Sequence, residues 1–471
     1  MKKDNLIFFT NVFYAVGAQV VSLLASLVVS FIAPKLIDVS NYAFWQLFLF
    51  YVTYVNITRL GLLDGLYLRL GGKKYKDLNH ARLGNEWLLF VIYQCIVASI
   101  LFVIVIFSQM EPDRKFVFGM CCLCMVIINS NNFFSYILQS VNQTKKFSIS
   151  VIIQNLIWFV AVAIIVCFKI YSYKVIVICY TVGHILAGIY LSHFTKEIWH
   201  VKHNEIKDTL NDIKLNIGCG IFLMISSYAG NLIIGSSRMI IDGAWGVETF
   251  GYFSFSLTLA NFFLTFINQI SLVLFPTLKS MKNDKQLETY SMVRDLLGLV
   301  LPGVLIGYLP ISILIKLWLP QYIPSLDYLM FFLPICTYDG KMQMLCSTYF
   351  KVLRKERLFM FINVTTMIFS ALLATIGCYV VKNIYFVAIC ILLVIAIRSI
   401  VSEIILARMM KKNIIIKLVE ENLLVLIFIL VTNIFNMYIA SIIYISIYII
   451  YLRINKNIIR KMVKKVRKKE K

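Results

Sequence analysis

One carboxylate and one ammonium group lie two residues apart in the stretch Cys336-Thr337-Tyr338-Asp339-Gly340-Lys341-Met342-Gln343. The surrounding segment, residues 329–350, is mostly apolar, and it is long enough to cross a bilayer, which takes about 20 residues. A charge at the centre of such a span costs roughly 2.5 to 3.5 kcal/mol even on the lenient insertion scale. We therefore expect both charged side chains to face protein or water, inside an enclosure formed by the rest of the chain.

The composition is that of a polytopic membrane protein. Of the 471 residues, 60% are hydrophobic and 15% are charged, and the mean hydropathy is +0.82. A soluble chain could not bury so much apolar side chain. The formal net charge of +23 would suggest a nucleic-acid partner in a soluble protein. Here its distribution follows membrane topology instead, so we expect no nucleic-acid partner.

Hydrophobic runs predict an all-α protein with about fourteen transmembrane helices. The runs are 7–33, 42–66, 84–107, 116–140, 148–168, 174–193, 216–241, 250–278, 293–318, 326–350, 358–380, 384–407, 417–435 and 437–454. The last two form an extra hairpin, residues 410–454, and the sequence leaves twelve and fourteen helices both open at this end.

Lysine and arginine orient these helices. With the N-terminus inside, the segments on the cytoplasmic side carry 35 of the 46 basic residues, and those on the outer side carry 8. This distribution obeys the positive-inside rule along the whole chain and predicts that both termini are cytoplasmic. The basic cytoplasmic tail, residues 455–471, is expected to face anionic membrane lipids.

An internal repeat divides the chain. Three pairs of residues align at a constant offset of 211: Val141 with Val352, Cys167 with Cys378, and Cys179 with Cys390. Since the offset spans six helices, an even number, both halves share one topology. We expect two pseudo-symmetric six-helix lobes, residues 1–194 and 215–409, around a central cavity. An amphipathic cytoplasmic connector, residues 195–214, would join them.

The repeat relates the opening stretch to a second polar cluster. Subtracting the offset from Gly340 and Lys341 gives Asn129 and Ser130, within Asn129-Ser130-Asn131-Asn132 in the fourth predicted helix. Both halves thus have polar residues at one depth, which favours the lining of a cavity. The alternative is hydrogen bonding between packed helices.

Short motifs add a family resemblance. Tyr42 and Gly251-Tyr252 lie just inside the second and eighth helices, and Leu274-Phe275-Pro276-Thr277-Leu278 ends the eighth. With the helix count and charge pattern, they resemble the polysaccharide-exporting branch of the multidrug/oligosaccharidyl-lipid/polysaccharide (MOP) exporter superfamily, over residues 1–410. The chain is most similar to Wzx-type O-antigen flippases. The resemblance implies a MATE-like fold, in the bacterial inner membrane, and translocation of undecaprenyl-pyrophosphate-linked oligosaccharide for lipopolysaccharide biosynthesis.

The resemblance has departures and further implications. Members often carry Asp-Arg near the outer end of the seventh helix, whereas this chain has Ser237-Arg238. Fourteen helices resemble the related lipid II flippases, in which the extra pair helps to hold the lipid tail, so the last hairpin is a candidate tail groove. Alternating access coupled to a H⁺ or Na⁺ gradient is implied, with other polysaccharide-assembly membrane proteins as partners.

Cations within the membrane are the expected ligands of the pyrophosphate. This anionic, strongly hydrated head cannot cross hydrocarbon unaided, because removing ions from water is costly. We expect it to be met by Lys341, Arg59, Arg398 and Arg238. For Arg59 and Arg398 the alternative is snorkelling to the inner interface.

Polar side chains within the spans are candidates for sugar binding and ion coupling. The sugar-binding candidates are Asn129, Asn131, Asn132, Tyr338, Gln269 and Asn155, each with helix–helix hydrogen bonding as the alternative. Asp339 and His184 are the candidates for ion coupling. Asp339 alternatively neutralises Lys341 or Arg398, and His184 is alternatively a packing residue.

Enzymatic function finds little support in the sequence. The eleven cysteines lie almost entirely within spans, and neither a Cys/His set with metal-ligand spacing nor a phosphate-binding glycine loop occurs. We therefore expect a transporter without metal or cofactor. An O-antigen polymerase is the main alternative, although the predicted outer loops are short. A small-molecule or drug antiporter of the same superfamily is the other.

Overall fold

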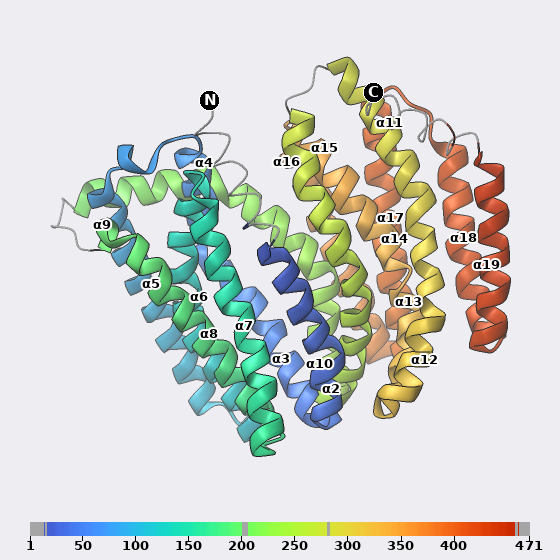
Figure 1. Ribbon diagram of the computed structural model, residues 1–471, viewed down its shortest axis with the longest axis horizontal. Helices are drawn as coiled ribbons and strands as arrows, with labels where there is room; N and C mark the ends of the chain where they lie inside the picture. Colours follow the sequence, from blue (N-terminus) through green and yellow to red (C-terminus); the bar gives the residue numbers. More distant parts are fainter. Residues whose placement is uncertain (1–13, 15–16, 200–205, 280–282, 457–459, 461–471) are drawn as a thin grey trace. The chain divides into compact units, whose positions relative to one another are not determined.

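The computed structural model describes residues 14, 17–199, 206–279, 283–456 and 460 (Figure 1). Side chains are described for these residues except 29, 206–207, 266–279, 283–286 and 288. The described chain is helical almost throughout and contains no strand, so the predicted all-α class is confirmed. Two compact units, residues 1–229 and 230–471, make up the chain. The predicted connector and basic tail lie partly outside the described residues.

The first unit is built from long helices joined by short turns. Its elements are η1 (Val28–Ile32), α2 (Ala33–Leu36), α3 (Val39–Tyr54), η2 (Val55–Arg59), α4 (Leu62–Leu70), η3 (Tyr75–Asp77), α5 (His80–Phe107), α6 (Pro112–Ser140), α7 (Thr144–Phe168), α8 (Tyr173–Phe194), α9 (Lys196–Trp199) and the first part of α10 (Ile206–Lys279). Helix α6 packs against α3, α4, α5 and α8 and is therefore central to the unit.

Local signals in the sequence set where these helices begin. Asp38 and Asn79 accept hydrogen bonds from backbone amides in the first turns of α3 and α5, and Ser172 does the same for α8. Pro112 stands at the first turn of α6, where its missing N–H leaves no bond unmade. These helices begin up to four residues before the hydrophobic runs predict, because the runs omit their polar first turns.

The second hydrophobic run, residues 42–66, folds as a broken helix. Leu60 and Gly61 adopt left-handed backbone angles, φ 52° and 81°, and the helices on either side are bent by 63°. Glycine is required here for space as well. A Cβ atom at Gly65 would lie 1.8 Å from the Asn216 carbonyl oxygen, and one at Gly220 would lie 2.1 Å from that of Gly61. The backbones of α4 and α10 therefore touch directly, as small residues permit in membranes.

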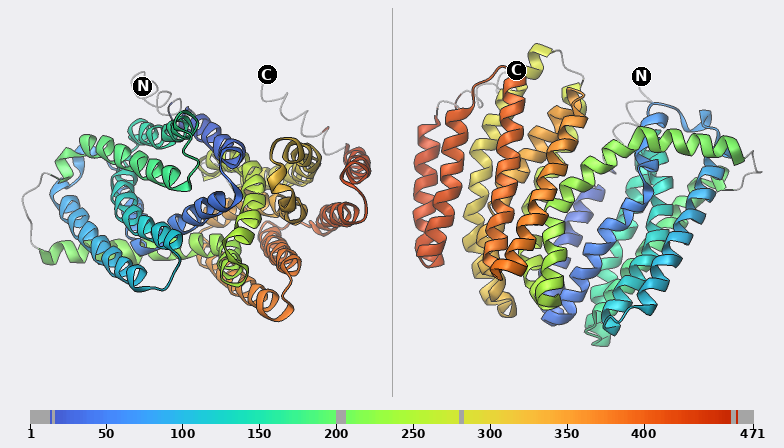
Figure 2. Two further views of the ribbon diagram at one scale, coloured as in Figure 1. Left: turned by 90° about the horizontal axis from the view of Figure 1, so that it is seen from below. Right: turned by 180° about the vertical axis from the view of Figure 1, so that it is seen from behind.

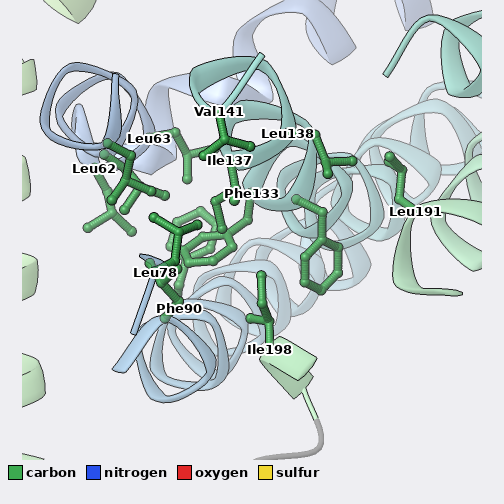
Figure 3. Packing of buried hydrophobic residues seen from close by; sticks show 14 residues of the cluster. Leu62, Leu63, Leu78, Phe90, Phe133, Ile137, Leu138, Val141, Leu191 and Ile198 are labelled. Carbon is green, nitrogen blue, oxygen red and sulfur yellow. The ribbon is translucent and has the colours of Figure 1, made fainter. Parts of the chain in front are cut away.

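Apolar packing anchors α4, the second part of this broken helix, to its neighbours (Figure 3). Leu62 and Leu63 of α4 join Phe133 and Ile137 of α6 in one cluster, and all four are almost fully buried. Phe90 of α5 extends the cluster. The direction of α4 after the break is thus fixed by side-chain packing on one face and by glycine contacts on another.

A polar network lies where α4, α5 and α10 meet. Arg69 forms an ion pair with Asp212 at 3.3 Å and donates to the Asn216 side chain at 2.7 Å. Asn216 in turn donates to Glu86 at 2.8 Å. Arg82 lies 3.5 Å from the Asp212 carboxylate. The network ties the start of α10 to both helices.

The second unit contains more interrupted helices. Its elements are the remainder of α10, α11 (Asn283–Val300), η4 (Leu301–Gly307), α12 (Tyr308–Trp318), η5 (Pro320–Ser325), α13 (Leu326–Phe332), α14 (Ile335–Lys341), η6 (Met342–Ser347), α15 (Thr348–Val352), α16 (Glu356–Thr375), η7 (Ile376–Val381), α17 (Ile384–Met409), α18 (Ile415–Ile434) and α19 (Met437–Ile454). Within α10, Gly246 is non-helical and separates the predicted spans 216–241 and 250–278.

Ten helices of the described chain are long and apolar enough to cross a membrane, or eleven with the bent pair around Gly61. The chain is thus a multi-pass membrane protein. Run 326–350 is divided at Pro334 and at the π-helix η6, and the run that forms α18 carries three charged residues. The interruption shortens the continuous apolar length of the first run, and the charges shorten that of the second. Both runs are nevertheless helical.

Helices α18 and α19 form the last hairpin and lie side by side (Figure 2). Pro302 lacks an N–H, so it cannot bond to the Gly298 carbonyl, and the helix changes to 3₁₀ geometry at η4. Hydroxyl groups of α19 donate to the carbonyls around this break: Tyr451 to Gly298 at 3.1 Å, Tyr448 to Leu299 at 2.7 Å and Tyr444 to Pro302 at 2.8 Å. The hairpin is thereby bonded to the rest of the second unit.

Candidate functional site

Arg59 is the last residue of η2 and lies at the break of the second span. Its side chain is only 7% exposed. The guanidinium donates to the Tyr228 hydroxyl at 3.0 Å and to the Asn56 carbonyl at 3.1 Å, and its central carbon lies 5.5 Å from the centre of the Tyr136 ring. Among the described side chains, no carboxylate lies within ion-pair distance of Arg59. Its direct contacts are thus aromatic and neutral groups, and Asp64 in the first turn of α4 interacts with it electrostatically from beyond ion-pair distance.

Amide side chains hold the break in place. Asn129, which is fully buried, donates to the Val55 carbonyl, to Thr58 at 3.1 Å and to Gln94 at 3.0 Å. Asn132 donates to the Asn56 side chain at 3.1 Å. One of these bonds satisfies the Val55 carbonyl, which a regular helix would use internally, and the others link side chains of α3–η2, α5 and α6. They match the alternative of helix–helix hydrogen bonding, and sugar binding by Asn129 and Asn132 stays a prediction.

The other polar candidates of the first unit form hydrogen bonds with residues other than Arg59. Asn131 donates to the His184 carbonyl at 2.6 Å, and Asn155 donates to Ser22 at 3.0 Å. The His184 ring packs 4.6 Å from that of Tyr180, and its buried Nδ1 has no hydrogen-bond partner among the described residues. The structure places these side chains between α6, α7, α8 and the first helix.

Lys341 is enclosed by charges of both signs in the second unit. Its ammonium contacts Glu421 of α18 directly and lies 3.3 Å from Glu403 of α17. Arg294 of α11 pairs with the same two carboxylates, at 2.7 Å from Glu403 and 3.0 Å from Glu421. All four side chains are at most 6% exposed. We call these four residues the charge cluster, and it carries no net charge.

Asp339 and Arg398 form a separate buried pair with 2.7 Å between their atoms. The interpretation that Asp339 neutralises a nearby cation thus matches the structure, with Arg398 and not Lys341 as its partner. Tyr338, the next residue back, donates its hydroxyl to Asn422 at 2.8 Å. The cavity beside Lys341 and Tyr338 measures 10 Å³, which is about the space that one water molecule needs.

Arg238 contacts residues on the far side of the break at Gly246. It donates to the Ser254 hydroxyl at 2.8 Å, and its guanidinium lies 4.8 Å from the centre of the Phe250 ring. The Gln269 side chain lies outside the described residues. The roles of Arg238, Gln269, Asn155, Asn131 and His184 therefore stay predictions.

The sequence did not reveal the carboxylates that complete the charge cluster. Glu403 and Glu421 lie 62 and 80 residues from Lys341, on two other helices. One signal was present, since both carboxylates stand inside or at the start of hydrophobic runs, where a charge needs a partner. Without the pairing of helices, that signal did not say which cation each would meet.

Metal ligation finds no support among the described residues. No group of three or more His, Cys, Asp or Glu side chains there is arranged to hold a metal ion. The eleven cysteines are all free, and seven of the eight buried ones lie in α6, α8, α14 and α17 or in the π-helix η6. They pack as small apolar residues in these positions.

Three solved structures share the fold of this chain. The lipid II flippase MurJ, in an inward closed conformation, superposes with a TM-score of 0.62 at 14% identity, covering 96% of this chain and 99% of that one. A multidrug resistance MATE family transporter of the MOP superfamily, inward-facing, gives a TM-score of 0.59 at 12% identity, covering 84% and 94%. Its outward-facing conformation gives 0.53 at 11% identity, covering 86% and 95%.

Sequence comparison identifies the family. No curated protein matches the chain significantly. A family model described as "Polysaccharide biosynthesis protein" matches residues 8–282, more than half of the chain. The chain therefore belongs to the polysaccharide biosynthesis protein family and has the fold of the MOP superfamily transporters.

Proposed function

We propose that the protein is a flippase that moves undecaprenyl-pyrophosphate-linked oligosaccharide, an O-antigen or similar repeat unit, from the inner to the outer leaflet of the bacterial cytoplasmic membrane. Its family and the fold that it shares with a lipid II flippase support a lipid-linked saccharide as the substrate. The observation that carries the proposal is Arg59, a buried cation at a helix break with no carboxylate partner among the described side chains.

The chemistry around Arg59 suits an anionic head. A buried guanidinium binds phosphate through strong, charge-assisted hydrogen bonds. Helix α4 begins directly after the break, and the first amides of a helix carry partial positive charge. Tyr228 and Tyr136 keep Arg59 in place without cancelling its charge. A pyrophosphate would thus meet a cation that has no direct ion pair to break, although Asp64 in the first turn of α4 partly offsets its charge.

The buried cations of the second unit can bind substrate only if their ion pairs with carboxylates open. Lys341 and Arg398 are paired with Glu403, Glu421 and Asp339. We propose that Arg398 binds the pyrophosphate in a different state of the transport cycle, in which its pair with Asp339 opens, while Lys341 stays within the charge cluster. A proton or sodium ion at Asp339 would release Arg398, which is the route to ion coupling that the pairing suggests. His184 is the second candidate for that step.

Complementation of a deletion strain tests the proposal. The strain should accumulate lipid-linked repeat units on the inner leaflet and lose long surface polysaccharide, and the wild-type chain should restore both. Arg59→Gln should fail to restore them, while Arg59→Lys restores them in part. Arg82→Gln is the matched control, since it removes an exposed cation of the first unit. Normal polymer in the deletion strain would contradict the proposal.

A small-molecule antiporter is the second candidate, because the fold is also that of a multidrug transporter. The buried positive charge of Arg59 would repel cationic drugs and so disfavours their binding. Loss of drug resistance in the deletion strain, with surface polysaccharide intact, would favour this candidate.

A further inference from the structure

An apolar groove runs between α16 and α17 in the second unit. Its volume is 490 Å³. Phe361 and Phe369 of α16 and Ile397 of α17 form its rim, and each is at least 60% exposed. The threonines in its lining, Thr365 and Thr366, donate their hydroxyls to backbone carbonyls of their own helix. The groove therefore offers almost purely apolar surface to whatever lies in it.

Among the described residues that line this groove, Arg398 alone is charged. It is 8% exposed. One nitrogen pairs with Asp339 at 2.7 Å, whereas the buried Nε has no hydrogen-bond partner among the described residues. An unsatisfied buried donor on a cation costs free energy, which an anionic oxygen would recover. A cation at the base of an apolar groove complements a ligand that joins an anion to a long apolar chain.

The depth of Arg398 selects among such ligands. It lies near the middle of α17, and at 1.5 Å per residue each end of this helix is roughly 15 to 20 Å away. An ordinary phospholipid keeps its phosphate at the membrane surface, so it cannot place its chains in the groove and its phosphate at Arg398. A lipid whose phosphate is carried through the bilayer passes this depth while its chain stays in hydrocarbon.

We propose that the α16/α17 groove holds the polyisoprenoid chain of the lipid-linked substrate, with the phosphate end of the chain at Arg398. This inference rests on the proposed function and specifies where the lipid tail lies. It places the tail on α16 and α17, rather than on the last hairpin as the resemblance implies. One face of α19 in that hairpin already bonds to the second unit through its tyrosines.

The first unit offers a matched control groove. It lies between α5 and α6, measures 520 Å³ and is apolar, with Phe102 and Phe116 among its lining residues. Its single charged residue is Lys115, in the first turn of α6 and thus near a helix end. The two grooves are alike in size and lining and differ in the depth of the cation. Bulk lipid should enter both equally, whereas the substrate chain should prefer the groove with Arg398.

Photo-crosslinking tests the assignment. The full chain, in phosphatidylglycerol vesicles, carries p-benzoylphenylalanine in place of Phe369 or, as control, of Phe102. The probe is radiolabelled undecaprenyl pyrophosphate. We expect the crosslinking yield at Phe369 to exceed that at Phe102 by on the order of tenfold, which is about 1.4 kcal/mol of preference. Arg398→Gln should remove the excess. Equal yields at the two positions would overturn the proposal.

A second variant keeps the test decisive if Arg398→Gln does not fold. Val401 lines the groove and is 42% exposed, so Val401→Trp fills the groove without disturbing a buried core. It should lower the yield at Phe369 to that at Phe102. Crosslinking at Phe369 without any translocation would support the groove and reject the flippase function. Translocation with no excess crosslinking at Phe369 would reject the groove alone.

Discussion

Arg59 and Lys341 are both cations buried within broken spans, yet their surroundings differ. Arg59 contacts two tyrosines and a backbone carbonyl. Lys341 contacts two carboxylates, which a second cation, Arg294, also contacts. In a buried ion pair each charge is already offset by its partner, whereas a buried cation without a direct ion pair attracts an incoming anion more strongly. The comparison indicates that Arg59 is available to the substrate charge in this conformation and that the charge cluster joins helices of the second unit.

The largest expected effect follows from breaking the charge cluster. Glu421→Ala leaves Lys341 and Arg294 with one carboxylate between them in a buried site, and we expect a loss of about 3 to 5 kcal/mol in unfolding free energy. Thermal unfolding of the purified protein in detergent measures it. A shift as small as that of a surface variant would mean that the cluster is hydrated and open.

Arg59→Gln should give the opposite pattern. No direct ion pair is broken and Asp64 loses only a longer-range attraction, so the unfolding free energy should change by about 1 kcal/mol. Translocation should fall by roughly 10- to 100-fold, because a charge-assisted hydrogen bond contributes about 1.5 to 3 kcal/mol. Vesicle flipping assays measure this rate. Severe destabilisation with translocation preserved per folded molecule would reverse the assigned roles.

Removing one tyrosine hydroxyl should have a smaller effect. Tyr448→Phe leaves the Leu299 carbonyl without its donor beside the Pro302 break, and we expect a loss of about 1 kcal/mol in unfolding free energy. Tyr438→Phe is the matched control, on the same helix and 53% exposed. If both variants unfold at the same temperature, the hydroxyl contacts at the break do not stabilise the hairpin.

The smallest effect is expected at the rim of the charge cluster. Lys417 pairs with Asp295 at 2.5 Å, but its side chain is 36% exposed. Exposed ion pairs contribute about 0 to 1 kcal/mol, so Lys417→Gln should barely change thermal unfolding. It also serves as the control for Glu421→Ala on the same helix. A loss similar to that of Glu421→Ala would extend the buried cluster to this pair.

The sequence predicted the helices better than their interruptions. Run 437–454 coincides with α19, and run 384–407 differs from α17 only at its end. Periodicity and apolar length determine such helices locally. The break at Leu60 depends on the close approach of α4 to α10 through Gly61, Gly65 and Gly220, which are distant in sequence. A glycine beside a buried arginine was the available signal, but its meaning required the neighbouring backbone.

The candidate site was likewise predictable only in part. The charged residues within the membrane were recognisable because each is costly there, and Arg59, Lys341 and Arg398 are indeed all buried. Their partners were not recognisable, since Glu403 and Glu421 approach Lys341 only when α14, α17 and α18 pack together. The difference between an available cation and a neutralised one is thus a property of the fold.

Binding of undecaprenyl pyrophosphate to the purified protein tests this difference most directly, using Arg59→Gln and the double variant Lys341→Met with Glu421→Leu. The double variant removes one charge of each sign and leaves Arg294 paired with Glu403. We predict that Arg59→Gln raises the Kd by roughly tenfold or more and that the double variant leaves it within about threefold of the wild type. Lost binding in the double variant, with unchanged binding in Arg59→Gln, would contradict the account.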